Sequence, residues 1–112
     1  MYDILANLNK TSGVTGSMVV GNDGIVIAAD LNSQTDDDTV GALASSIASA
    51  VRKSLDGLGC GEFAQITVEA EGRKMFLSNA GIGTLIVTTE PHVNIGLVRL
   101  EIRNAVSELQ RV

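Results

Sequence analysis

Few side chains in this sequence could carry nucleophilic or metal chemistry, and Cys60 and His92 are its only cysteine and its only histidine. A cysteine nucleophile needs a histidine within hydrogen-bonding distance and a third group that orients the imidazole ring. The elements expected from the sequence place Cys60 and His92 in separate loops, with no reason for the two to meet. One cysteine and one histidine also fall short of the ligands of a structural zinc site. We therefore expect a protein that is not an enzyme, has no metal site and needs no cofactor.

Two further motifs contain residue types found in calcium-binding and phosphate-binding loops, but a helix start and a loop connection explain them better. The run Asp36–Asp38 lacks the alternating acidic positions and the bidentate glutamate of a calcium loop. Carboxylates are favoured at the start of a helix, although such a run can also form a charged rim that steers a partner. The glycine-rich segment Gly57–Glu62 follows a helix and precedes a strand, which is the reverse of a phosphate-binding loop. We interpret this segment as a flexible connection.

The overall composition is typical of one small domain, residues 1–112. The net charge is −5, and 45% of the residues are hydrophobic but only 3% aromatic. An acidic surface repels phosphate backbones and anionic lipids, so we expect neither nucleic acids nor membranes as partners. The single cysteine cannot form an internal disulfide, and the pattern of a signal peptide or a membrane-spanning run is missing. We therefore expect a cytoplasmic protein.

Hydrophobic periodicity and turn residues predict eight helices and strands. They are a helix over residues 1–10, strands over 16–21 and 25–30, a helix over about 35–55, strands over 65–70, 74–78 and 84–89, and a helix after Asn94. Gly24 is expected to close the first hairpin, because glycine adopts a positive φ without a steric penalty. Thr35 is expected to cap the middle helix and Gly57 to end it, while Asn94 caps the last helix.

This element order, α-β-β-α-β-β-β-α, predicts an α/β sandwich of three layers. The first hairpin and the last three strands are each antiparallel, and the middle helix connects the two groups. If the fifth strand pairs with the first, a five-stranded antiparallel sheet has the order 2-1-5-4-3. The middle helix then covers one face and the two terminal helices cover the other, which explains why the fifth strand is apolar throughout.

The strand order leaves the third strand, Gln65–Ala70, at an edge of the sheet. Edge strands are templates for pairing with another chain, and natural proteins often protect them with proline or lysine. This strand contains neither residue. We therefore expect it to pair with the same strand of a second copy.

The middle helix points to the same conclusion, because eight of the ten residues from Gly41 to Ala50 are Gly, Ala or Ser. The larger residues Leu43, Ile47, Val51, Leu55 and Leu58 are expected to face the chain's own sheet. The small residues would then allow another backbone to approach closely, although they could also form a solvated face. The expected dimer interface comprises Val40, Ala44, Ser45, Ala48, Gln65, Ile66, Thr67, Val68 and Glu69. A further partner is expected to contact Gly41, Ser49 and Arg52.

With these features the chain resembles the Roadblock family, the dynein light-chain domain that bacterial gliding-motility polarity regulators of the MglB type share. The resemblance extends over nearly the whole chain. It is carried by the opening helix, Gly13–Gly16 leading into Met18–Val20, the turn Asn22–Gly24, the middle helix rich in Ala and Ser, and the segment Asn94–Arg99. The final helix is more similar to the prokaryotic members than to the dynein type.

The resemblance implies a Roadblock/profilin-like fold and a homodimer whose third strands pair and whose middle helices lie side by side. It also implies that the dimer binds a small Ras-like GTPase as a non-catalytic regulator or scaffold, and modulates its nucleotide hydrolysis. A small-molecule sensor and an adaptor like the dynein light chains are the alternatives. The sequence argues against a sensor, since it has few aromatic residues and no convergent polar cluster in an apolar pocket.

Overall fold

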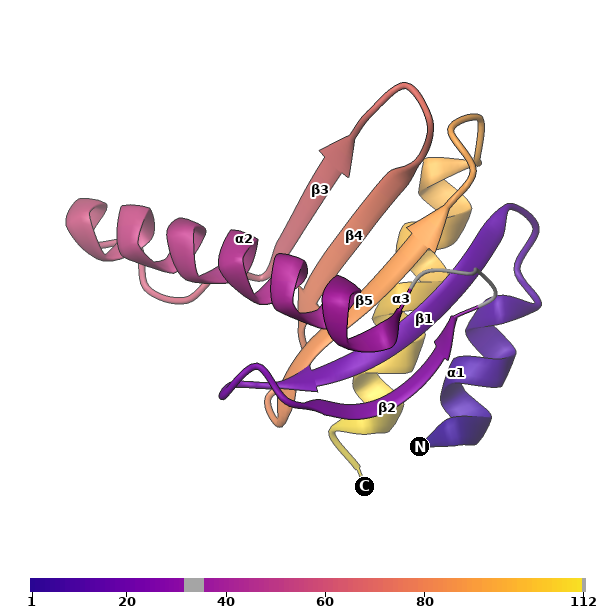
Figure 1. Cartoon of the computed structure of the whole chain (residues 1–112), viewed down its shortest axis with the longest axis horizontal. Coiled ribbons are helices and arrows are strands. Elements are labelled where there is room, and N and C mark those ends of the chain that lie inside the picture. Colours follow the sequence, from indigo (N-terminus) through magenta and orange to yellow (C-terminus); the bar gives the residue numbers. More distant parts are fainter. Residues whose placement is uncertain (32–35, 112) are drawn as a thin grey trace.

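The computed structural model describes residues 1–31 and 36–111 of the chain. The elements follow the expected order, with the bounds α1 (Tyr2–Asn9), β1 (Val14–Gly21), β2 (Val26–Leu31), α2 (Asp37–Leu58), β3 (Gln65–Glu69), β4 (Lys74–Asn79), β5 (Gly83–Thr89) and α3 (Ile95–Leu109). The strands form one antiparallel sheet in the order β2-β1-β5-β4-β3 (Figure 1). The α/β fold expected from the sequence, including its strand order, is therefore confirmed.

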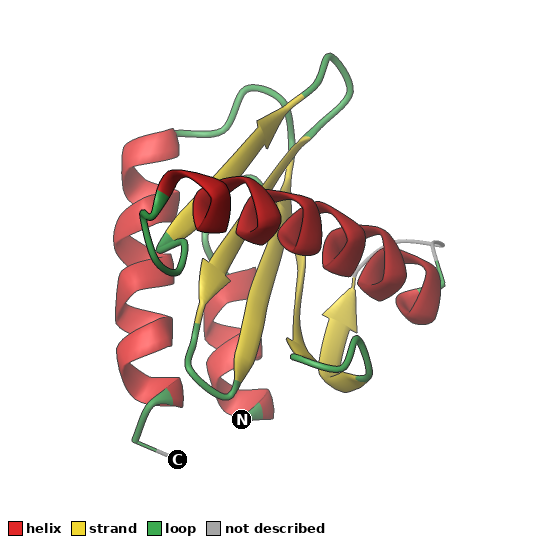
Figure 2. Cartoon of the chain, turned by 90° about the vertical axis from the view of Figure 1, so that its left-hand side faces the viewer, coloured by secondary structure: helices red, strands yellow, loops and turns green. Residues whose placement is uncertain are grey.

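The sheet separates two apolar cores, because helices cover both of its faces (Figure 2). One core lies between the sheet and the pair α1 and α3, where Phe76 and Leu85 are fully buried. The other lies beneath α2 and contains Leu77 and Ile86. Neighbouring strand residues alternate between the two cores, as the period of a β-strand requires. Burial on both faces explains why every residue of the central strand β5 is buried.

Two of the expected local signals are confirmed at the ends of elements. Gly24 has a φ of 84° in the turn between β1 and β2, where the Gly21 N–H donates to the Ile25 carbonyl over 2.8 Å. The side chain of Asn94 caps α3, since its Oδ1 accepts a hydrogen bond from the Leu97 N–H over 3.1 Å. Gly24 can adopt a positive φ because it has no Cβ atom. Asn94 provides a hydrogen-bond acceptor for an N–H of the first helical turn that has no partner within the helix.

The ends of α2 differ from the expectation. Thr35 lies outside the described residues, and Asp36 is the residue at the N-cap position. The expected end at Gly57 is wrong, because Gly57 is still helical and the helix closes at Gly59, whose φ is 68°. The Cys60 N–H then donates to the Leu55 carbonyl, which satisfies a carbonyl of the last turn. Two glycines in close succession made the stop ambiguous in the sequence.

The face that α2 turns toward the sheet also differs from the expectation. Leu43 and Leu58, expected to pack on the sheet, are 59% and 76% exposed. The buried residues of α2 are instead the small ones, namely Val40, Gly41, Ala44 and Ala48. Ile47, Val51 and Leu55 are half-buried at the border of this core. The small residues do allow a close backbone approach, but the surface they approach is the chain's own sheet.

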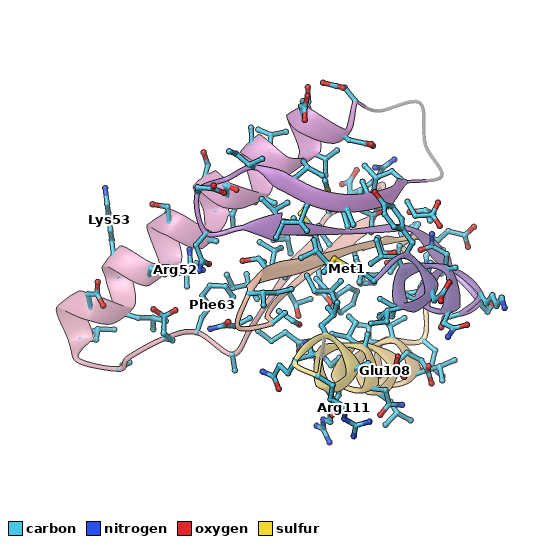
Figure 3. The ribbon with its side chains drawn as sticks, turned by 90° about the horizontal axis from the view of Figure 1, so that it is seen from below. Met1, Arg52, Lys53, Phe63, Glu108 and Arg111 are labelled. Carbon is cyan, nitrogen blue, oxygen red and sulfur yellow. The ribbon has the colours of Figure 1, made fainter. Side chains whose placement is uncertain are left out.

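The long helix α2 does not lie on the sheet along its full length. Its first turns lie over β2 and β1, where Gly41 comes close to Val26 and Val20, and its last turns extend beyond the edge strand β3 (Figure 1). A view along the sheet shows the same end of the helix diverging from the strands (Figure 3). Among the described helices, none combines the length and the apolar character required to cross a membrane.

Candidate protein interface

The strand β3 forms one edge of the sheet, as expected from the sequence. Asn79 donates its N–H to the Ala64 carbonyl, and Ala70 donates its N–H to the Arg73 carbonyl. In an antiparallel pair, the residues that bond to the neighbour alternate with residues whose backbone groups point away from it. The N–H and C=O groups of Gln65, Thr67 and Glu69 therefore point outward from the sheet. They form a row of backbone donors and acceptors that another strand can pair with.

The side chains of β3 divide between the two faces of the sheet. Ile66 and Val68 lie on the α2 side and are half-buried, and Ile66 packs against the core beneath α2. Gln65 and Thr67 lie on the α3 side, where Thr67 accepts a hydrogen bond from Arg99 over 3.3 Å. The side chains of β3 are therefore apolar on the α2 side of the sheet and polar on the α3 side.

The residues of α2 expected at the interface have different environments. Val40, Ala44 and Ala48 are 7%, 1% and 2% exposed, because they pack against the chain's own sheet. Gly41, expected to contact a partner, is buried in the same way. Ser45 is half-buried and Ser49 is exposed. Of the set expected from the sequence, the two serines are therefore the small residues of α2 that another protein can reach directly.

The outer face of α2 is mostly small and uncharged, and it includes residues that the sequence reasoning missed. Between Ala42 and Ser54, the exposed residues on this side are Ala42, Leu43, Ser46, Ser49, Ala50, Lys53 and Ser54, and the exposed Asp38 and Asp56 lie toward the two ends of the helix. Leu43 is the large apolar side chain among them. The i, i+4 spacing of Val40, Ala44 and Ala48 defines the stripe that faces the sheet, but Leu43, Ile47 and Val51 have the same spacing, so the sequence offered two stripes.

A hollow of about 220 Å³ separates α2 from the hairpin that joins β1 and β2. It is lined by Gly21, Asn22, Asp23, Gly24, Ser45, Ala48, Ser49, Arg52 and Thr84. The structure thus brings the hairpin next to Ser45, Ser49 and Arg52. The sequence reasoning treated Asn22–Gly24 only as a turn, because nothing in the local pattern shows which helix the turn will meet.

Arg52 is held by residues of its own chain. Its Nε lies 3.4 Å from Glu62 Oε2, and its guanidinium carbon lies 5.1 Å from the centre of the Phe63 ring. Phe63 is buried, and it lies on the same side of α2 as Arg52, while Lys53 points away from the sheet (Figure 3). The stacked arginine connects the end of α2 to the segment that leads into β3. It is therefore a bracing residue as well as part of the hollow's wall.

The residues considered for chemistry lie apart. Cys60 is exposed in the connection after α2, and His92 is exposed between β5 and α3, at the opposite end of the molecule (Figure 1). Asp36–Asp38 are exposed at the start of α2, where Thr39 donates its hydroxyl to Asp36 Oδ2 over 3.0 Å. Within residues 1–31 and 36–111, no three His, Cys, Asp or Glu residues gather as metal ligands would. The glycine-rich segment Gly57–Glu62 connects α2 to β3, as interpreted from the sequence.

Comparison with known proteins agrees with this architecture. Residues 1–90, which include α1 to β5, match the family model described as the Roadblock/LC7 domain. Two uncharacterized proteins of Methanocaldococcus jannaschii are each 40% identical to the chain over 107 residues, covering 96% of the chain and 94% of each relative. The chain belongs to the Roadblock/LC7 domain family.

Solved structures extend the likeness of this Roadblock/LC7 domain to α3, which lies outside the family match. A Roadblock/LC7 domain from Streptomyces avermitilis superimposes with a TM-score of 0.90 at 24% identity, covering 99% of this chain and 95% of that one. MglB of Myxococcus xanthus has a TM-score of 0.88 at 24% identity, covering 97% and 93%. The gliding protein MglB of Thermus thermophilus has a TM-score of 0.85 at 20% identity, covering 98% and 85%. At these identities the likeness shows a shared fold.

Proposed function

We propose that this Roadblock/LC7 domain is a homodimeric, non-catalytic regulator or scaffold that binds a small Ras-like GTPase. The observation that carries the proposal is the position of the open β3 edge beside the end of α2 that extends beyond the sheet. Pairing two copies through β3 would bring two α2 helices together. The proposal extends the dimer and the GTPase partner that the family resemblance implies to this chain, and the similarity to MglB supports it.

Dimerisation would bury the apolar side chains at the C-terminal end of α2 that the chain's own sheet covers only in part. Val51 and Leu55 are only half-buried, and Leu58 is 76% exposed. A second copy that pairs through β3 would place its own α2 against these side chains, and burial of apolar surface favours association by about 25 cal/mol per Å². A solved structure of MglB with a tetrameric arrangement, which is 21% identical to this chain with a TM-score of 0.85, supports the proposed self-association.

The outer face of α2 is the surface we assign to the GTPase. Its central part is mostly small and uncharged, it includes the exposed Leu43, and it borders the hollow lined by Ser45 and Ser49. In a dimer, the two copies of this face would form a composite platform that a monomer lacks. Arg52 already contacts Glu62 and Phe63, so its role is to brace the platform. The domain would therefore act by holding or reshaping the switch loops of the GTPase, and binding would depend on the bound nucleotide.

The test is a calorimetric titration of a Ras-like GTPase encoded near this chain, loaded with GDP or with a GTP analogue. We expect one nucleotide state to bind more tightly. Leu43→Arg should weaken that binding about tenfold or more, because a charged side chain would replace an apolar contact at the platform. Leu100→Arg is the matched control, since Leu100 is 51% exposed on α3, on the other side of the sheet.

The outcomes separate the proposals. Loss of binding in Leu43→Arg but not in Leu100→Arg would support the assigned face. Equal affinity for the two nucleotide states would leave a scaffold without nucleotide sensing, as in the adaptor alternative. Failure of the parent chain to bind any of the nearby GTPases would refute the proposed partner.

A further inference from the structure

A cleft of about 370 Å³ lies on the opposite side of the sheet from α2, between α3 and the strands β3 and β4. It is lined by Ala64, Gln65, Ser78, Asn79, Arg99, Ile102, Arg103 and Val106. The cleft lies on the other side of the sheet from the face that we assign to the GTPase. Its size suits a small molecule and is too small for a folded protein.

The charged residues of the cleft are two arginines of α3. Arg99 and Arg103 are four residues apart, so their side chains start from neighbouring positions on one flank of the helix. Arg99 donates from Nη2 to Thr67 Oγ1 over 3.3 Å, which directs its guanidinium toward β3. Guanidinium groups are donors only, and they bind carboxylate and phosphate oxygens in a bidentate manner. The pair is therefore suited to one oxyanion group placed between the two.

The acidic residues of α3 lie on the opposite flank of the helix. Glu101 and Glu108 line a hollow beside α1, together with Asn7 and Asn104. Within the part of the chain that the structure describes, no carboxylate lines the cleft of Arg99 and Arg103. Like charges four residues apart destabilise a helix when no opposite charge compensates them. The protein thus concentrates positive charge in one place although its net charge is −5.

The rest of the cleft supplies polar donors and an apolar wall. Gln65 donates from Nε2 to Ser78 Oγ over 3.2 Å, and Ser78 is 4% exposed. Asn79 also lines the cleft, and because its Oδ1 accepts from the Gly81 N–H over 3.0 Å, its amide nitrogen remains as the donor that it can offer a ligand. Ile102 is buried and Val106 half-buried along the helix side of the cleft. Arg99, Arg103 and Gln65 are exposed at the mouth of the cleft, so a ligand can reach their donors from solvent while its apolar part contacts Ile102 and Val106.

We propose that this cleft binds a small oxyanion-bearing molecule, with Arg99 and Arg103 holding its phosphate or carboxylate group. The apolar part of the ligand would lie against Ile102 and Val106. Gln65 and Asn79 would contact the ligand on the strand side. This proposal does not depend on the GTPase, and the cleft adjoins the β3 edge without using the outward backbone groups of β3 that would pair with a second copy.

The test uses nuclear magnetic resonance titrations of the full chain with inorganic phosphate, phenyl phosphate and benzoate. At about 150 mM salt, where the screening length is about 8 Å, diffuse attraction to surface charges is weak. We expect saturable shifts of the backbone amides around residues 64–65, 78–79 and 99–106. Phenyl phosphate should bind more tightly than inorganic phosphate, because its ring can contact the apolar wall. The comparison of phenyl phosphate with benzoate identifies which oxyanion the cleft prefers.

The control variants separate a specific site from general charge. Arg99→Gln and Arg103→Gln should each weaken binding of the best probe about tenfold, which is the usual scale for one charge-assisted hydrogen bond. Arg111→Gln removes the same charge from an exposed residue outside the cleft and should leave the affinity unchanged. Shifts that do not saturate for any of the probes, or an equal loss in Arg111→Gln, would overturn the proposal.

Discussion

At the residue scale, Gly41 lies where α2 approaches the sheet closely. A Cβ atom at this position would be 3.1 Å from Val26 Cγ2 and 3.5 Å from Val20 Cγ2. The adjacent Ala42 is exposed on the outer side of the same helix. A larger side chain would therefore clash with the sheet at position 41 but would point into solvent at position 42, although both positions belong to the same run of small residues.

We predict that Gly41→Leu destabilises the fold by about 1–3 kcal/mol, because extra methylene groups would force the helix away from the strands. Urea unfolding followed by circular dichroism measures this change. Ala42→Leu is the control and should change the free energy of unfolding by less than about 0.5 kcal/mol. Equal effects of the two substitutions would mean that α2 is oriented differently on the sheet.

The same residues show where reasoning from the sequence reached its limit. A helix rich in small residues can bury either its small or its large side chains, and both stripes have helical spacing. Leu43 and Leu58 were expected beneath the helix because apolar area usually decides burial. The close approach that Gly41, Ala44 and Ala48 permit decides it here instead. The hydrophobic pattern of a helix does not predict how closely the helix will approach the sheet.

At the element scale, the order and type of the helices and strands could be predicted well. Alternation in Gln65–Glu69 and the helical period from Ile95 to Leu109 are strong signals, and both elements form as expected. The end of α2 was predicted wrongly at Gly57, because Gly59, two residues later, is also a glycine and is the one that adopts the left-handed conformation. The hollow between the β1–β2 hairpin and α2 could not be predicted, because it depends on how distant segments pack.

The open edge of β3 gives a prediction at this scale. Thr67→Pro removes an outward-pointing N–H but leaves the residues that bond β3 to β4, so an edge strand should tolerate it. We expect the parent chain to have twice the mass of 11.6 kDa in light scattering, and Thr67→Pro to be a monomer. Thr67→Val is the matched control, because it keeps the backbone N–H and removes only the hydroxyl group that accepts from Arg99. A dimeric Thr67→Pro would show that the copies associate through another surface.

At the scale of the whole molecule, the sheet divides the chain into two surfaces with different roles in this account. The α2 side offers a weakly charged platform that includes Leu43, next to the β3 edge. The α3 side contains the cleft of Arg99 and Arg103. Residues 1–90 place the chain in the Roadblock/LC7 domain family, and α3 adds the arginines beyond that match.

The central claim is that two copies of the chain together form the surface that a small Ras-like GTPase recognises. The most direct test is light scattering of the GTPase, loaded with a GTP analogue, mixed with Thr67→Val or with Thr67→Pro. The account predicts that Thr67→Val forms a complex that contains two copies of the chain. Thr67→Pro should bind the GTPase at least about tenfold more weakly, because half of the platform is missing. A monomeric Thr67→Pro that binds the GTPase as tightly as Thr67→Val would contradict the account.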